Sequence, residues 1–183
     1  MNGEQIEIEK KFLVTNDDWH SEVKSSFTIY QGYYSDNTGE NKRIRLVLED
    51  KKAIIGFKQD IGEEKGFIKR IEIEKKIEYL DGLLLLFKCK KFLVKKRHLI
   101  DFNNKCIEVD VFQNLKSPLT MAEIEISKND LKDTSFLKFP SWLDKDVSNI
   151  NKYRNFNLIR LSEKHDFYLK ELLKDNSALK LKS

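Results

Sequence analysis

The 183-residue chain contains only 2 prolines, 7 glycines and 2 cysteines. So few breakers leave no linker-like stretch, which favours one domain, expected at residues 1–160, followed by a C-terminal helical tail at 161–183. The two cysteines, Cys89 and Cys106, match neither a metal-ligand spacing nor a disulfide framework. Unpaired cysteines are typical of proteins in reducing compartments, so we expect a cytoplasmic location.

Long apolar runs and a signal-peptide pattern are also missing. The longest apolar run, Leu83 to Phe87, is far shorter than the roughly 20 residues needed to span a bilayer. Acidic residues occupy the N-terminal region where a signal peptide has basic and apolar ones. The formal net charge of +4, from 34 basic and 30 acidic residues, is too small to indicate nucleic-acid binding by itself. We therefore expect neither a membrane nor a nucleic acid as a partner.

Alternation of apolar and polar residues is the main structural signal in the chain. It predicts strands at about 5–14, 27–35, 42–49, 52–59, 67–75, 91–101, 105–113 and 119–127. Asn and Gly residues predict hairpin turns at 36–40 and 101–105. Helices are expected just after Thr15–Asp18 and at 77–88, 128–137, 149–160 and 163–174. The fold class is therefore α+β, with an eight-stranded antiparallel β-barrel and helices packed on its outside.

One face of nearly every predicted strand carries charges in pairs of like sign. Glu7 and Glu9 project from the same face of the first strand because side chains alternate along a strand. The spacing recurs in Arg43-x-Arg45, Arg70-x-Glu72-x-Glu74, Lys95-x-Arg97, Glu108-x-Asp110 and Glu123-x-Glu125. An ordinary exposed face is the alternative interpretation, with cross-strand ion pairs worth about 0.2–1 kcal/mol each. The segregation of acidic and basic residues onto different strands favours a water-filled tunnel instead. Closing the sheet would turn its charged face into the lining of that tunnel, where water, counter-ions or a ligand can compensate the charges.

The residue types of this face are suited to a metal-bound polyanion. Basic side chains converging from several strands can neutralise a chain of phosphates. The candidates are Lys11, Arg43, Arg45, Lys58, Arg70, Lys95 and Arg97. Carboxylate pairs can hold Mg²⁺ or Mn²⁺, which prefer oxygen ligands. The candidate metal ligands are Glu7, Glu9, Glu123 and Glu125, with Asp110 as a further one.

Among the aromatic and histidine residues, only Tyr33 is expected near the site. Its hydroxyl can contact a phosphate or pair with Lys11, and core filling is the alternative role of the ring. The three histidines, His20, His98 and His165, have no ligand-like spacing and are expected to be structural or surface residues.

Nine short motifs, in this order, resemble the triphosphate tunnel metalloenzyme (CYTH domain) superfamily, especially its short bacterial members active on inorganic tripolyphosphate. They are EIEKKFLV at 7–14, YQGY at 30–33, RIR at 43–45, FK at 57–58, RIEIE at 70–74, VKKR at 94–97, EVDVF at 108–112, AEIE at 122–125 and KYRN at 152–155. The resemblance covers about residues 5–160.

The resemblance implies a tunnel that binds a triphosphate and a divalent metal and hydrolyses the terminal phosphate. It implies metal-binding carboxylates at Glu7, Glu9, Glu123 and Glu125, and triphosphate contacts from the seven basic candidates. It also implies that the carboxylates of Glu72 and Glu74 help to place metal or water and that Tyr33 pairs with Lys11, which makes these four the catalytic candidates.

The segment after the last strand departs from the family pattern. It reads DVSNINKY at 146–153, where Ile150 replaces a usual carboxylate, although Lys152 remains available for phosphate. Closure of the tunnel by this segment is therefore an open question.

A hydrolase acting on inorganic tripolyphosphate is the expected function, with the small-molecule triphosphate as its partner. A class IV-type adenylate cyclase and a thiamine or nucleoside triphosphatase are alternatives on the same fold. A non-catalytic polyphosphate-binding module would lose the metal carboxylates, and an RNA-binding sheet would expose aromatic residues for stacking. Whether the chain forms a homodimer is left open.

Overall fold

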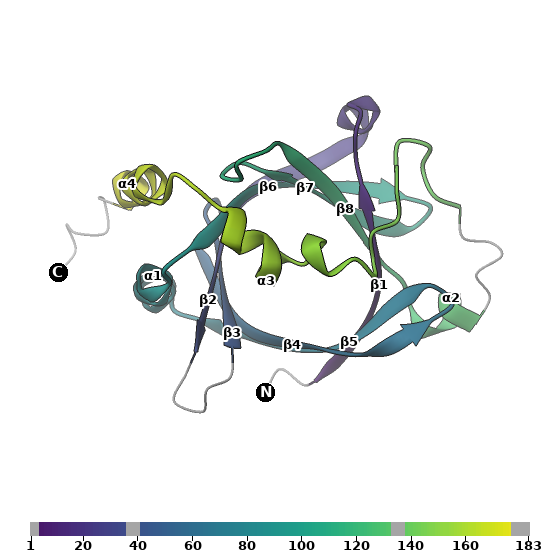
Figure 1. Ribbon diagram of the computed structural model, residues 1–183, viewed down its shortest axis with the longest axis horizontal. Coiled ribbons are helices and arrows are strands. Elements are labelled where there is room, and N and C mark those ends of the chain that lie inside the picture. The colour runs from purple at the N-terminus through teal and green to yellow at the C-terminus, as the bar shows by residue number, and fades with distance from the viewer. Residues whose placement is uncertain (1–3, 36–40, 133–137, 177–183) are drawn as a thin grey trace.

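The computed structural model describes residues 4–35, 41–132 and 138–176. Its eight strands form one closed antiparallel barrel with the neighbour order β1-β5-β4-β3-β2-β6-β7-β8, closed by pairing of β8 with β1 (Figure 1). The strands are β1 (Gln5–Leu13), β2 (Val23–Ser35), β3 (Asn41–Val47), β4 (Lys52–Glu64), β5 (Phe67–Ile77), β6 (Phe92–Phe102), β7 (Lys105–Phe112) and β8 (Leu119–Glu125). The predicted fold class is confirmed.

The strands differ from the prediction mainly in length. Strand β4 continues to Glu64 because it passes a register shift between Asp60 and Gly62 and stays paired with β5. Alternation is lost in this polar stretch, so the sequence pattern did not predict it. The predicted turn at 101–105 is confirmed, and Asn103 and Asn104 both have left-handed backbone, with φ of 50° and 61°. The predicted turn at 36–40 lies outside the described residues.

The helices cover the outside of the barrel and one of its openings. A 3₁₀ turn, η1 (Asp18–Glu22), follows β1, and the α-helices are α1 (Tyr79–Lys88), α2 (Lys128–Lys132), α3 (Asn155–Leu158) and α4 (His165–Asp175). Part of the predicted helix at 128–137 lies outside the described residues. The predicted single helix at 149–160 is wrong, since α3 is flanked by the 3₁₀ turns η2 (Asn151–Tyr153) and η3 (Ile159–Leu161). Arg154 separates η2 from α3 with an extended ψ of 135°.

Most of the apolar core lies outside the barrel wall. Helix α1 packs against β2, β3 and β4, and α4 contacts Tyr30 of β2 and Phe92 of β6 on the same side of the barrel (Figure 1). Leu86 of α1 and Leu172 of α4 are fully buried in one apolar cluster there. Close approach of α1 depends on Gly82, because a Cβ there would lie 2.4 Å from the Cβ of Ala53. Tyr168 of α4 donates a hydrogen bond to the carbonyl of Gln113, so part of the predicted tail is attached to the barrel. The division into 1–160 and 161–183 stays a prediction.

A smaller apolar cluster closes one end of the barrel. Its buried members are Leu93, Phe112, Met121 and Leu158. The first three lie two residues from the inward-facing Lys95, Asp110 and Glu123, so alternation points them into the barrel as well. Leu158 comes from α3, which crosses this opening in Figure 1. We refer to residues 151–161 as the lid. Within the described residues, no helix combines the length and apolar character needed to cross a membrane.

Candidate functional site

The barrel interior brings the charged rows of distant strands together. Strand pairing sets Glu9 opposite Glu125, Lys11 opposite Glu123, and Glu7 opposite Arg70. Most of these groups are withdrawn from solvent, as the 2% exposure of Glu9 illustrates, whereas Glu125 is exposed. Burying so many charges is tolerable because carboxylates and basic groups alternate in space and neutralise each other. The charged face predicted from the sequence is therefore an inner lining.

Three predicted metal ligands meet at one point of this lining. One carboxylate oxygen from each of Glu7, Glu9 and Glu125 lies within 4.8 Å of the others. Such a set of hard oxygen donors fits Mg²⁺ or Mn²⁺. Glu123 and Asp110 lie outside this triad and are engaged by basic side chains instead.

Burial and neighbouring carboxylates change the acidity of the triad. Burial, followed by a hydrogen bond shared with Glu72, raises the pKa of Glu7 to about 8. Burial, followed by repulsion from Glu108, raises the pKa of Glu125 to about 7. Although burial also acts on Glu72, its hydrogen bond with Glu7 and the charges of Lys58 and Arg43 lower its pKa to about 2. A cation bound at the triad would favour the ionised forms of Glu7 and Glu125.

Two basic residues connect the triad to the rest of the lining. The Lys58 ammonium contacts Glu7 closely and lies 3.2 Å from Glu9 Oε2. The Arg70 guanidinium contacts Glu9 through Nη1, and its Nε donates to Asp60 Oδ1 at 2.6 Å. Lys58 and Arg70 therefore contact the triad on one side and line the neighbouring cavity on the other.

The wall formed by β6 and β7 is neutralised internally. Asp110 accepts two hydrogen bonds of 2.7 Å from Arg97 and a further contact from Lys95. Arg97 also contacts Glu108, and Lys95 is 0% exposed. Because of these bonds, the pKa of Asp110 is lowered even though its burial acts in the opposite direction. The structure thus places Asp110, a predicted metal ligand, in an ion-pair network.

The opposite wall is less completely paired. Arg43 contacts both Glu72, at 2.5 Å, and Glu74. Arg45 lies 3.7 Å from Glu74 at its nearest carboxylate oxygen, and its buried Nε has no hydrogen-bond partner among the described residues. Burial and then the charge of Arg43 lower the pKa of Arg45. A buried guanidinium with so little compensation has unused capacity for an anion.

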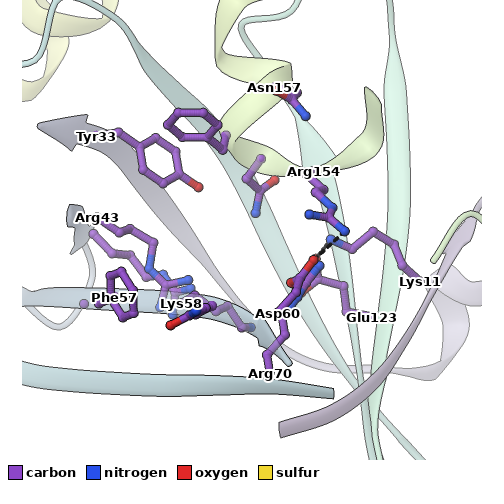
Figure 2. A pocket seen from close by; sticks show the side chains of 15 residues that line it. Lys11, Tyr33, Arg43, Phe57, Lys58, Asp60, Arg70, Glu123, Arg154 and Asn157 are labelled. Atoms are coloured by element: carbon purple, nitrogen blue, oxygen red, sulfur yellow. Dashed lines mark hydrogen bonds and ion pairs between the residues drawn. The ribbon is translucent and has the colours of Figure 1, made fainter. Parts of the chain in front are cut away.

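A cavity of about 760 Å³ lies between these basic groups and the lid (Figure 2). Seven predicted site residues line it: Lys11, Tyr33, Arg43, Arg45, Lys58, Arg70 and Glu123. The Glu123 carboxylate forms an ion pair of 2.8 Å with the Lys11 ammonium. The buried phenol of Tyr33 accepts a hydrogen bond from Gln31 at 2.8 Å, so the predicted pairing of Tyr33 with Lys11 is not a direct contact here.

Two charged residues of the cavity were missed by the sequence analysis. Asp60 of β4 and Arg154 of the lid both line the cavity and are joined by an ion pair of 2.5 Å. Lys152, predicted to reach phosphate, is exposed and lies over the ring of Tyr153, 4.9 Å from its centroid. The KYRN motif at 152–155 contains both Lys152 and Arg154, so it was the available signal for Arg154. The predicted continuous helix at 149–160 did not show which of these two basic side chains points into the cavity.

No family model matches the chain, but two of the known proteins that resemble it are inorganic triphosphatases. An inorganic triphosphatase from Acetivibrio thermocellus is 32% identical over 157 residues, which cover 84% of this chain and 93% of that protein. The solved structure of the inorganic triphosphatase NE1496 is 25% identical and has a TM-score of 0.57, covering 86% of this chain and 95% of that one.

A third relative agrees in fold alone. HpAC1 from Hippeastrum, described as a candidate adenylyl cyclase with a dominant triphosphatase activity, is 14% identical over 70% of this chain and 83% of its own, with a TM-score of 0.55. The closed charged barrel and the identity to the Acetivibrio protein over nearly its whole length lead to one assignment. The chain belongs to the triphosphate tunnel metalloenzyme superfamily, as a relative of the bacterial inorganic triphosphatases.

Proposed function

We propose that this protein is a divalent-metal-dependent hydrolase that releases the terminal phosphate of inorganic tripolyphosphate inside the barrel. The observation that carries the proposal is the meeting of a three-carboxylate group with a set of buried basic side chains across Lys58. A binding module for polyanions needs only the basic groups. Carboxylates beside a phosphate site would repel the ligand unless a cation lies between them, so their presence favours a metal-assisted reaction.

The residues around the triad fit Mg²⁺ or Mn²⁺. Glu7, Glu9 and Glu125 would hold the ion, and Glu125 has no ion-pair partner among the described residues, which leaves its carboxylate available. Bound there, the ion would supply charge neutralisation at phosphate oxygens and acidify a water molecule. Glu123 and Asp110 stay predictions as further ligands, and their ion pairs with Lys11, Lys95 and Arg97 would have to rearrange first.

The basic residues would bind and orient the triphosphate. Arg43, Arg45 and Arg70 offer planar N–H donors that match phosphate oxygens, and Lys11 and Lys58 offer compact positive charges. Together they would stabilise the charge that develops on the transferred phosphoryl group and on the leaving pyrophosphate. Glu72 and Glu74 would hold Arg43 in place, which is a positioning role.

Phosphate release from a substrate panel tests the function. Purified protein is assayed with tripolyphosphate, ATP and thiamine triphosphate, each with Mg²⁺, with Mn²⁺ and with EDTA. We expect tripolyphosphate to have the highest kcat/KM and EDTA to abolish turnover. Formation of cyclic AMP without phosphate release would support the cyclase alternative instead.

A carboxylate variant tests the metal role. Glu125→Gln is expected to lower kcat by about 100-fold or more while tripolyphosphate binding without metal is retained. Glu163→Gln, at an exposed position outside the cavity, is the matched control and should keep wild-type kcat. Full activity of Glu125→Gln would contradict the assignment of the triad.

The remaining expectations belong to the same proposal. Cys89 and Cys106 are both free thiols, which supports a reducing, cytoplasmic location. The oligomeric state stays open, and the mass of the purified protein in solution would determine it.

A further inference from the structure

A chain of four alternating charges runs from the carboxylate triad to the lid. Glu9 contacts Arg70 Nη1, Arg70 Nε donates to Asp60 Oδ1 at 2.6 Å, and Asp60 Oδ2 accepts Arg154 Nη2 at 2.5 Å. Asp60 thus bridges two guanidinium groups, one on the barrel wall and one on the lid. Figure 2 shows Arg154 extending from the lid toward Asp60 on β4.

The position of Asp60 is unusual for a carboxylate. It lines the same cavity as Lys11, Arg43, Arg45 and Lys58, where an anionic ligand is expected. A fixed carboxylate there would repel a phosphate group, unless the phosphate takes over its partners. Each carboxylate oxygen of Asp60 accepts from one guanidinium, in the way that two oxygens of a phosphate can.

Arg154 depends on Asp60 for its charge compensation. Within the described residues, their contact is the one ion pair between the lid and the barrel, and the side chain of Arg154 remains 35% exposed. Its Nε is buried without a hydrogen-bond partner. Other contacts hold the lid as well. Leu158 packs in the closing cluster, and Phe156 makes an edge contact with Tyr33, with ring centroids 5.2 Å apart. The backbone carbonyls of Arg160 and Leu161 accept hydrogen bonds from Lys91 and Lys116. The lid can therefore stay in position when Arg154 changes its partner.

We propose that Asp60 is a placeholder anion that occupies Arg70 and Arg154 until a phosphate group of the substrate displaces it. This inference rests on the proposed function and adds Arg154 of the lid as a substrate-binding residue. Displacement transfers the two guanidinium groups from the carboxylate to phosphate oxygens, and the freed Asp60, itself 33% exposed, turns toward solvent. The exchange involves ion pairs and hydrogen bonds, and no covalent bond is made or broken.

The two partners then have opposite effects on affinity, which a purely structural ion pair would not produce. Tripolyphosphate binding is measured by calorimetry in EDTA, where turnover is prevented. Asp60→Asn removes the competing anion and should lower Kd by about three- to tenfold, whereas Arg154→Met removes a phosphate contact and should raise Kd by about tenfold. Asp60→Glu keeps the negative charge and should stay within about twofold of wild type.

Matched controls separate this effect from lid packing and from net charge. Glu63→Gln changes a carboxylate on the same hairpin that accepts from Asn149 at 2.6 Å but does not line the cavity. Arg160→Met removes one positive charge from an exposed position of the lid. Both should leave Kd within about twofold of wild type, and thermal unfolding of every variant monitors its folding.

The outcomes separate the placeholder from the proposed function. Opposite shifts of Kd in Asp60→Asn and Arg154→Met, with wild-type Kd in both controls, would support the placeholder. If both variants bind more weakly while the wild type hydrolyses tripolyphosphate, the ion pair is structural and the placeholder is wrong. If the wild type neither binds nor hydrolyses tripolyphosphate, the proposed function itself fails.

Discussion

The two walls of the barrel contain similar basic pairs in very different electrostatic settings. On β6, Lys95 and Arg97 share Asp110, and Arg97 also contacts Glu108. On β3, Arg43 contacts Glu72 and Glu74, whereas the one ion pair of Arg45 with a described residue is the 3.7 Å contact with Glu74. The same two-residue spacing in the sequence therefore produces a closed network on one wall and an incompletely compensated arginine on the other.

The difference indicates which charges are available for a ligand. A buried cation with a complete set of partners must lose them before it can bind an anion, and that loss offsets most of the gain. Arg45 would lose only its long contact with Glu74 on binding an anion, so nearly the full free energy of the charge-assisted hydrogen bonds would favour binding. We infer that the β6–β7 wall mainly holds the barrel together and that the β3 wall mainly binds substrate. Three predictions test this contrast, and a fourth concerns the outer face of β6.

Asp110→Asn is expected to have the largest effect. It leaves Lys95 and Arg97 buried without their shared carboxylate, which should cost about 3–5 kcal/mol of unfolding free energy and lower Tm by roughly 10 °C. Thermal and urea unfolding measure the loss. A normal Tm combined with weaker metal binding would instead support Asp110 as a metal ligand and remove the contrast between the walls.

Arg45→Met is expected to affect activity and leave stability almost unchanged. Loss of its contacts to phosphate should lower kcat/KM for tripolyphosphate by about 100-fold. The Tm should stay the same or rise, because the variant removes a buried charge with little compensation. A fall in Tm as large as that of Asp110→Asn would show that both walls are structural.

Glu74→Gln should change stability only slightly. Glu74 is 29% exposed, and Arg43 keeps its contact with Glu72 in this variant, so we expect a loss below about 1 kcal/mol. Urea unfolding of Glu74→Gln beside Asp110→Asn compares one carboxylate from each wall directly. Equal losses would count against the division of roles.

The smallest predicted effect is a pH dependence that arises on the outer face of β6. Burial, then the charges of His20 and Lys96, lower the pKa of His98, so the folded state favours the neutral imidazole. This contribution is complete above the unfolded-state pKa of about 6.5 and is lost as pH falls below that value. The lowered pKa of Asp110 keeps this carboxylate ionised throughout this range, whereas Glu7 and Glu125, with pKa values of about 8 and about 7, gain protons within it.

The Tm at pH 7.5 and at pH 5.5 measures this contribution. Protonation of Glu7 and Glu125 over the same range stabilises the folded state and acts in both proteins. We therefore expect the Tm change on going to the lower pH to be more negative in the wild type than in His98→Gln, by roughly 1–3 °C. An identical change in both proteins would assign the pH dependence to other groups.

Local sequence patterns predicted the barrel well because side-chain alternation has a strict period of two. Once the sheet closes, that period fixes which residues line it, so Glu7, Arg43 and Lys95 could be assigned to one interior from their spacing alone. The lid was predicted less well. Its segment has helical composition, but Arg154 adopts an extended backbone between η2 and α3, and packing of Leu158 on the barrel end overrides the local preference.

The sequence by itself determined the fold and most of the charged lining, because these follow from alternation and residue type. Only the tertiary structure decided how the charges are paired. Asp110 forms ion pairs with two cations, whereas Arg45 has one long contact of 3.7 Å with a carboxylate among the described residues. Asp60 connects Arg70 to Arg154. Ion pairing depends on distances of a few ångströms between residues on different strands. Spacing along the chain does not encode those distances.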